Sequence, residues 1–249
     1  MASPRGIFIT FEGPEGSGKS TQVGELITRL ESRGETVIQA REPGGTRTGE
    51  AIREILQHDR AGEPICSETE ALLFAASRAQ LVRRTIVPAL EAGHCVVCDR
   101  FADSTTAYQG YGRGFAIERM ISINEFAIDG AQPDITLLLD IDFETTRERM
   151  AARNQAAGST LDRIEREEES FHRRVRDGYL KLARRYADRF VTIDGSAPPE
   201  RIAEQIWSHV EPILCRECRP GPCRHPAEPG CRAPCPCLPG LRSRPRRRR

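Results

Sequence analysis

The stretch that most constrains the fold of this chain is GIFITFEGPEGSGKSTQ, at residues 6–22. Residues 7–11 are apolar, β-branched or aromatic, which predicts a buried strand. Residues 13–20 fit the pattern G-x-x-x-x-G-K-[ST], and apolar residues follow at helical spacing as far as Gly34. A strand, a glycine-rich loop and a helix in this order predict a phosphate-binding loop rather than an ordinary glycine-rich turn.

Lysine is rare in this chain, and one lysine stands in the predicted loop. The chain has 37 Lys and Arg residues together, and only Lys19 and Lys181 are lysines. Lys19 therefore indicates a position that needs a compact ammonium on a flexible stem rather than a planar guanidinium. We expect the loop amides and Lys19 to bind phosphate oxygens, and the Ser20 hydroxyl to bind Mg²⁺.

Strand-like and helical patterns alternate along the chain. The strand-like runs are 7–11, 36–39, 95–98, 135–141 and 190–193, and the helical patterns are 19–33, 48–57, 67–92, 117–129, 142–155, 163–187 and 200–213. Such alternation predicts a five-stranded parallel sheet covered on both faces, a three-layer α/β/α fold. Polar residues after the first three strands, at 12–20, 41–46 and 99–100, predict a ligand site at the carboxyl edge of the sheet.

Residues 215–249 differ in composition from the rest and form a predicted disordered tail, rich in Cys, Pro and Arg, after a domain at 1–214. Ten arginines against two glutamates give the tail a surplus of eight positive charges, so residues 1–214 carry a net charge of −7. Nucleic-acid binding by the domain is therefore not expected. For the tail, we favour a non-functional extension over a zinc knuckle or a basic segment for anionic partners.

Two further features bear on compartment and chemistry. Cys95 and Cys98 form a C-x-x-C pair, but strand alternation places them on opposite faces, so we interpret them as buried apolar residues rather than a redox or metal site. No apolar run is long enough to span a bilayer, and residues 1–6 lead directly into the first strand. We expect a cytoplasmic protein without a membrane partner.

Residues 147–176 are dense in charge, and residues 154–160 interrupt the helical pattern with Gly and Ser. One interpretation is a solvated helical face with ion pairs four residues apart. The other is a helical lid at about 147–165, which carries arginines over a phosphate site.

Six separated blocks resemble the bacterial thymidylate kinase (dTMP kinase) family: FEGPEGSGKST, REPGGT, LLFAASRAQ, DRFADSTTAYQGYGRG, NEFAIDGAQPDITLLLD and LDRIE. They follow the family's order and spacing across residues 5–213, and FAASR and STTAYQG are the most specific. The resemblance implies a P-loop kinase fold and phosphoryl transfer from ATP to dTMP, giving ADP and dTDP for dTTP synthesis. It also implies Mg²⁺ bound with ATP, and a homodimer formed through the long helices after the second and third strands.

The resemblance implies roles for individual residues. Phe74 stacks on thymine, Arg78 hydrogen-bonds its carbonyl edge, and Tyr108 packs under the deoxyribose. The implied ATP-binding residues are Gly13, Pro14, Glu15, Gly16, Ser17, Gly18, Lys19 and Ser20. The implied dTMP-binding residues are Glu42, Arg53, Phe74, Ser77, Arg78, Arg100, Thr105, Tyr108 and Gln109. The implied metal-binding residues are Ser20 and Asp99, the latter through water, and the implied catalytic residues are Lys19, Glu15, Arg100, Arg149 and Arg153.

Structural explanations compete with several of these roles. Phe74 fits a core position, Arg78 a surface arginine, Tyr108 a helix-face aromatic, and Asp99-Arg100 an ion pair at a strand end. Two other functions also compete. One is a different nucleoside monophosphate or deoxynucleoside kinase, and the other is a P-loop ATPase with a nucleic-acid-binding tail.

Overall fold

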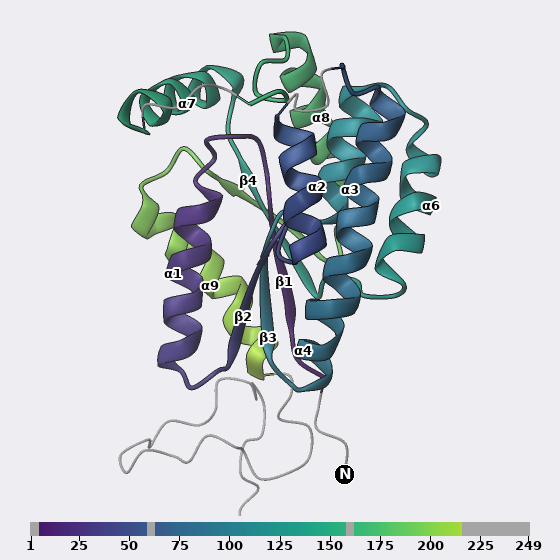
Figure 1. The fold of residues 1–249 in the computed structure, drawn as a ribbon. Helices are drawn as coiled ribbons and strands as arrows, with labels where there is room; N and C mark the ends of the chain where they lie inside the picture. The colour runs from purple at the N-terminus through teal and green to yellow at the C-terminus, as the bar shows by residue number, and fades with distance from the viewer. Residues whose placement is uncertain (1–4, 59–62, 158–161, 216–249) are drawn as a thin grey trace, which may run out of the picture.

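The computed structural model of the chain describes residues 5–58, 63–157 and 162–215. The expectations for the tail at 216–249 and for residues 158–161 of the lid lie outside these ranges. The centre of the fold is a five-stranded parallel sheet with strand order β2-β3-β1-β4-β5 (Figure 1). The strands are β1 (Phe8–Glu12), β2 (Val37–Arg41), β3 (Cys95–Asp99), β4 (Ile135–Asp140) and β5 (Phe190–Asp194).

The first strand, β1, lies in the middle of the sheet, and every one of its residues is buried. It pairs with β3 and β4, and the register places Phe11 opposite both Asp99 and Leu137. A strand covered on both faces needs apolar residues at consecutive positions, which is the pattern that residues 7–11 show. The predicted five-stranded parallel sheet is confirmed.

Helices cover both faces of the sheet. The α-helices are α1 (Lys19–Ser32), α2 (Arg47–Gln57), α3 (Ser67–Leu81), α4 (Val87–Glu91), α5 (Ala102–Thr105), α6 (Ile117–Ile128), α7 (Phe143–Ala157), α8 (Glu169–Arg185) and α9 (Pro199–Cys215). Two π-helical segments are η1 (Val82–Ile86) and η2 (Thr106–Gly112). Among the described residues, none of these helices is long and apolar enough to cross a membrane.

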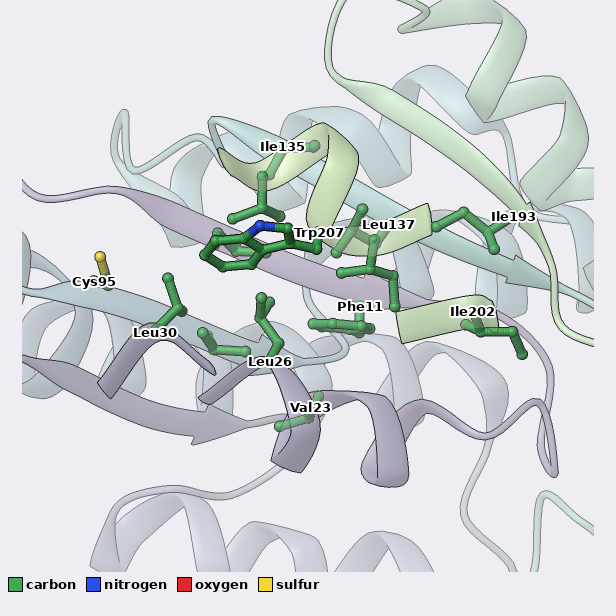
Figure 2. Close-up of a cluster of buried hydrophobic side chains, with 14 of the residues drawn as sticks. Phe11, Val23, Leu26, Leu30, Cys95, Ile135, Leu137, Ile193, Ile202 and Trp207 are labelled. Carbon is green, nitrogen blue, oxygen red and sulfur yellow. The ribbon is translucent and has the colours of Figure 1, made fainter. Parts of the chain in front are cut away.

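Helices α1 and α9 cover one face, where Trp207 packs with Leu26, Leu30 and Leu137 (Figure 2). On the opposite face, α3, η1 and α4 enclose a second cluster around Phe8 and Phe101. Cys95 belongs to the first cluster and Cys98 to the second, so the C-x-x-C pair is divided between two faces as expected. The three-layer α/β/α architecture is therefore confirmed.

Several predicted helix bounds are wrong. The single helix expected at 67–92 is α3, a π-helical turn and α4, and the helix expected from residue 163 begins at Glu169. Residues 102–112, for which no helix was predicted, form α5 and η2. A π-helical turn is wider than an α-helical one and is frequent at functional sites, and η2 carries Tyr108 and Gln109 to the cavity described below.

The ends of two other helices also differ from prediction. Helix α7 continues through Asn154 to Ala157, because Gln155, Ala156 and Ala157 have good helix propensity. Helix α9 continues past Pro212 to Cys215. Ile213 and Leu214 pack against the cluster around Trp207, and this packing outweighs the hydrogen bond that proline cannot donate.

Candidate active site

A cavity of about 520 Å³ opens at the carboxyl edge of the sheet, where ligands bind in folds of this type. It brings together fifteen of the predicted site residues. They are Glu15, Gly16, Gly18, Lys19, Ser20, Glu42, Arg53, Phe74, Asp99, Arg100, Thr105, Tyr108, Gln109, Arg149 and Arg153. The other predicted residues, Gly13, Pro14, Ser17, Ser77 and Arg78, are not part of this lining.

The loop between β1 and α1 has the backbone geometry of a phosphate-binding loop. Gly13 has φ +137°, and a Cβ atom there would lie 2.3 Å from the Leu139 carbonyl oxygen. Gly18 is the N-cap of α1 with φ +90°, and no described side chain caps this helix. The first amides of α1 therefore remain available at the positive end of the helix, where an anion is favoured.

Lys19 folds back over the phosphate-binding loop. Its Nζ atom donates to the carbonyl oxygens of Gly13 (3.1 Å) and Pro14 (2.7 Å) and to Ser17 Oγ (3.3 Å). Burial and the nearby Arg100 lower the pKa of Lys19 to about 8. The three loop residues absent from the cavity lining thus hold the lysine in place.

Ser20 and Asp99 meet at the end of β3. Ser20 Oγ donates to Asp99 Oδ2 over 3.1 Å, and both residues line the cavity. A hydroxyl and a carboxylate oxygen beside a phosphate-binding loop are the ligand types that Mg²⁺ accepts when substrate phosphates and water complete its coordination. These residues therefore fit the implied ion.

Arg100 is the centre of the polar network in the cavity. It has φ +67°, an uncommon conformation for a residue other than glycine. Its guanidinium donates to the Gly13 carbonyl oxygen (3.0 Å), Ser104 Oγ (3.2 Å), Tyr179 OH (3.1 Å), Tyr108 OH (3.2 Å) and Glu15 Oε1 (2.5 Å). Burial alone would raise the pKa of Glu15, but Arg100 and Lys19 outweigh it and lower the pKa to about 2.

Glu12, Ser104 and Tyr179 support Arg100, and sequence reasoning did not assign them roles. Glu12 accepts hydrogen bonds from Ser104 Oγ (2.6 Å), Tyr179 OH (2.9 Å) and the Phe101 amide (2.8 Å). Burial and the nearby Asp103 raise the pKa of Glu12 to about 7. A carboxylate at the end of a predicted buried strand was the available signal for Glu12. No such signal existed for Tyr179, because its helix lies far from Glu12 and Arg100 in the sequence.

The loop after β2 forms another wall of the cavity. The Gly44 amide donates to Ser77 Oγ (3.1 Å), which gives Ser77 a supporting position behind the lining. Arg53 Nη1 donates to the Pro43 carbonyl oxygen (2.9 Å) and also lines the cavity. Arg53 is thus held by the loop that carries Glu42.

Arg78 lies deeper than a surface arginine. Its side chain is 1% exposed, so the surface interpretation is wrong. The guanidinium donates to Glu42 Oε2 (2.6 and 2.9 Å), Asn124 Oδ1 (2.7 Å), Thr105 Oγ1 (2.9 Å) and the Phe101 carbonyl oxygen (3.3 Å). Arg78 thus joins two residues of the cavity wall, Glu42 and Thr105, from behind. Direct contact with a base remains a prediction.

Phe74 is half-buried on α3 and lines the cavity, so it does not occupy a fully buried core position. Two arginines of α7, Arg149 and Arg153, also reach the cavity. Arg149 Nη1 donates to the carbonyl oxygens of Gly195 (2.9 Å) and Gly16 (3.3 Å). Arg153 pairs with Glu165 at 2.6 Å. Arg149 therefore contacts the phosphate-binding loop directly.

The geometry defines a class of protein. A phosphate-binding loop with its lysine, a serine and an aspartate placed for a metal, and an arginine-centred pocket share one cavity in a parallel α/β fold. A P-loop enzyme that transfers a phosphoryl group between nucleotides needs these parts.

Comparisons with known proteins identify the family. The thymidylate kinase family model matches residues 11–206. A thymidylate kinase of Pelotomaculum thermopropionicum is 50% identical over 210 residues, which are 84% of this chain and 95% of that protein. Those of Geobacillus thermodenitrificans (49% over 205 residues, 82% and 89%) and Desulfovibrio desulfuricans (46% over 215 residues, 86% and 99%) are also similar. The chain belongs to the thymidylate kinase family.

Proposed function

We propose that the cavity carries out the reaction of this family with the residues described above. The chain is a dTMP kinase, which transfers a phosphoryl group from ATP to dTMP and yields dTDP and ADP for dTTP synthesis. The observation that carries the assignment is the single cavity that holds both Lys19 and Arg100. The acceptor is an anionic phosphate oxygen, so positioning and charge neutralisation are the main requirements and no general base is needed.

The donor half of the site consists of residues 13–20. The amides of the loop and of the first turn of α1 bind the β- and γ-phosphates of ATP, and Lys19 moves from the loop carbonyls to these phosphates. Ser20 would hold the Mg²⁺ that accompanies ATP, and Asp99 would hold it through water. The 3.1 Å contact between Ser20 and Asp99 supports this assignment. When bound there, the ion would supply positive charge to the phosphate oxygens.

The acceptor half lies on the other side of Arg100. Arg100 and Arg53 bind the phosphate of dTMP, Phe74 stacks on thymine, and Tyr108 packs under the deoxyribose. Thr105 and Gln109 contact the base, while Glu42 and Ser77 shape the pocket. Glu15, held by Arg100 at 2.5 Å, lies between the two phosphate sites and orients the groups that react.

The lid arginines stabilise the transferring group. Its charge is spread over its oxygens during transfer, so a cation that approaches from the lid lowers the barrier. Arg149 already contacts the Gly16 carbonyl oxygen at 3.3 Å. Arg153 must leave its ion pair with Glu165 before it can contact phosphate. We propose that Arg149 acts first and Arg153 completes the site.

A coupled assay of ADP release tests the function. We expect the highest kcat/KM with dTMP in a panel of dTMP, dUMP, dCMP, AMP and GMP. A preference for another nucleotide would assign a different kinase activity. ADP release without any acceptor would instead favour the ATPase interpretation. ATP and dTMP are cytoplasmic metabolites, so we place the reaction in the cytoplasm.

We also propose that the enzyme is a homodimer formed through α2, α3 and α6, which lie side by side (Figure 1). Their outer surfaces expose Ile55 (43%), Leu72 (58%) and Phe126 (86%). A contiguous exposed apolar patch marks an interaction site, and we propose that these three residues contribute to one. We expect Phe126→Glu to convert the dimer to a monomer in light-scattering measurements, and Phe126→Leu to remain dimeric. A monomeric native protein would contradict the proposal.

The tail is expected to be dispensable. Ile213 and Leu214 still pack against the Trp207 cluster, whereas residues 215–249 contain eight prolines and few aliphatic side chains. Truncation after Leu214 should therefore leave dTMP kinase activity and Tm unchanged, because little apolar burial is lost. The zinc interpretation predicts the opposite. Our expectation would be refuted if the full chain binds stoichiometric zinc and if truncation removes this zinc and lowers Tm.

A further inference from the structure

Glu70 is a buried carboxylate that has no part in the roles assigned above. It lies in the first turn of α3, its side chain is 1% exposed, and it does not line the cavity. It accepts hydrogen bonds from Gln109 Nε2 (2.8 Å) and from Arg113 Nε and Nη2 (3.2 and 3.0 Å). Arg163 Nη2 forms an ion pair at 2.6 Å with Glu70 Oε2, the same oxygen that accepts from Arg113 Nη2. Glu70 thus connects Gln109, a residue of the proposed acceptor site, to Arg163 near the end of the predicted lid.

The two arginines keep this carboxylate ionised. Burial alone would raise the pKa of Glu70, but hydrogen bonds from Arg113 and Gln109 and the charges of both arginines outweigh it and lower the pKa. Each arginine is itself held in place. Arg113 Nη1 pairs with Glu167 at 2.6 Å, and Arg163 Nε donates to the Leu56 carbonyl oxygen at 3.1 Å. Glu70 is therefore a fixed acceptor without a proton of its own.

An ionised carboxylate decides which way the Gln109 amide faces. It can only accept hydrogen bonds, so the amide nitrogen of Gln109 must face Glu70. The amide is planar, and its carbonyl oxygen therefore points away from Glu70. Gln109 itself lines the cavity, so the polar atom it leaves for a ligand is Oε1, an acceptor. An acceptor suits a base with a ring N–H, whereas a base that presents an unprotonated ring nitrogen meets repulsion.

We propose that Glu70 is a positioning residue for base selection, which holds the Gln109 amide so that Oε1 accepts the N3–H of thymine and disfavours cytosine. This inference rests on the proposed acceptor site at Gln109. Glu70 does not touch the nucleotide and acts through Gln109. The same ion pairs with Arg113 and Arg163 keep the amide from turning over.

Isothermal titration calorimetry of dTMP and dCMP, with kinetics on the same proteins, tests the inference. Glu70→Gln can donate to Gln109 and so lets the amide adopt both orientations. We expect it to weaken dTMP binding by about tenfold while dCMP binding stays the same or improves, because a mismatched polar pair is costly. The KM for ATP should not change. Gln109→Ala should lose the same preference, and the double variant should lose no more than either single variant.

Glu167→Gln is the matched control, since it removes the other carboxylate on Arg113 and leaves the contact between Glu70 and Gln109. Its preference for dTMP over dCMP should equal that of the native enzyme. Equal weakening of both nucleotides in Glu70→Gln, or additive effects with Gln109→Ala, would overturn the inference and leave Glu70 a structural residue. If Glu70→Gln does not fold, Glu70→Asp tests the inference through the same ratio of dTMP to dCMP affinity. Its shorter side chain keeps the negative charge but does not reach Gln109. Absence of dTMP turnover in the native enzyme would refute the proposed function instead.

Discussion

Lys19→Ala should lower kcat by more than about a hundredfold, which corresponds to roughly 3 kcal/mol of lost transition-state stabilisation. Lys19 is the cation of the phosphate-binding loop, and its Nζ atom lies 2.7 Å from the Pro14 carbonyl oxygen. In the proposed complex it leaves this oxygen for the phosphates of ATP. Binding of dTMP should persist, because we assign the acceptor phosphate to Arg100 and Arg53 rather than to Lys19. Steady-state kinetics with calorimetry on dTMP provide the measurement.

The other lysine of the chain is the control. Lys181 is exposed on α8, where its Nζ atom lies 5.1 Å from the centre of the Tyr111 ring. Lys181→Ala should keep a normal kcat. Lys19→Arg should not restore activity, because a guanidinium is bulkier and less adaptable than an ammonium. A near-normal kcat in Lys19→Ala would contradict the assignment of the loop.

The same lysine gives the reaction a pH dependence. Burial and the nearby Arg100 lower the pKa of Lys19 to about 8 in the free protein. The Nζ atom therefore loses its proton as pH rises through that value, and kcat/KM for ATP should fall there, since this parameter reports the free enzyme. Bound phosphates favour the charged form, so the corresponding fall in kcat should occur at a higher pH.

Arg78→Ala should destabilise the fold by about 3–5 kcal/mol, because it leaves the buried Glu42 carboxylate without its cation. The two side chains are 1% and 3% exposed and lie 2.6 Å apart. Burial already raises the pKa of Glu42 to about 7 despite the opposing effect of Arg78. Denaturant unfolding measures the loss. In the fraction of Arg78→Ala that remains folded, kcat/KM for dTMP should also fall, and this fall should exceed any change in the KM for ATP.

The pH dependence of the stability lost in Arg78→Ala distinguishes two causes, an unpaired charge on Glu42 and the removal of side-chain volume. A carboxyl whose pKa is raised by folding contributes stability at low pH, and this contribution is lost as pH rises through the folded value. Without Arg78 the pKa of Glu42 rises further, so the destabilisation should be greater at about pH 8 than at about pH 5. Glu42→Gln in the Arg78→Ala background should recover part of it. A loss independent of pH would contradict this account.

Local pattern predicted the elements of this fold well and their limits less well. The sheet follows from consecutive apolar residues, and α1 from apolar spacing after the loop, because a buried strand and a helix face each impose a local period. The interruption at Val82–Ile86 and the start of α8 at Glu169 leave no such period in the sequence. Helix η2 was missed, since residues 106–112 are mostly polar or small and are ordered by packing against α8.

The sequence alone determined the phosphate-binding loop, the parallel sheet and the family, because each depends on residues that are neighbours in the chain or on blocks kept in order. Only the tertiary structure decided which side chains touch across the cavity. Tyr179 donates a hydrogen bond of 2.9 Å to Glu12, which is 167 residues away in the sequence. Gln109 likewise donates a hydrogen bond of 2.8 Å to Glu70 on another helix. Such contacts join parts of the chain that the fold brings together, so spacing carries no signal for them. The structure also excluded the alternative that Arg78 is a surface arginine, because its side chain is 1% exposed and burial depends on what packs over a residue.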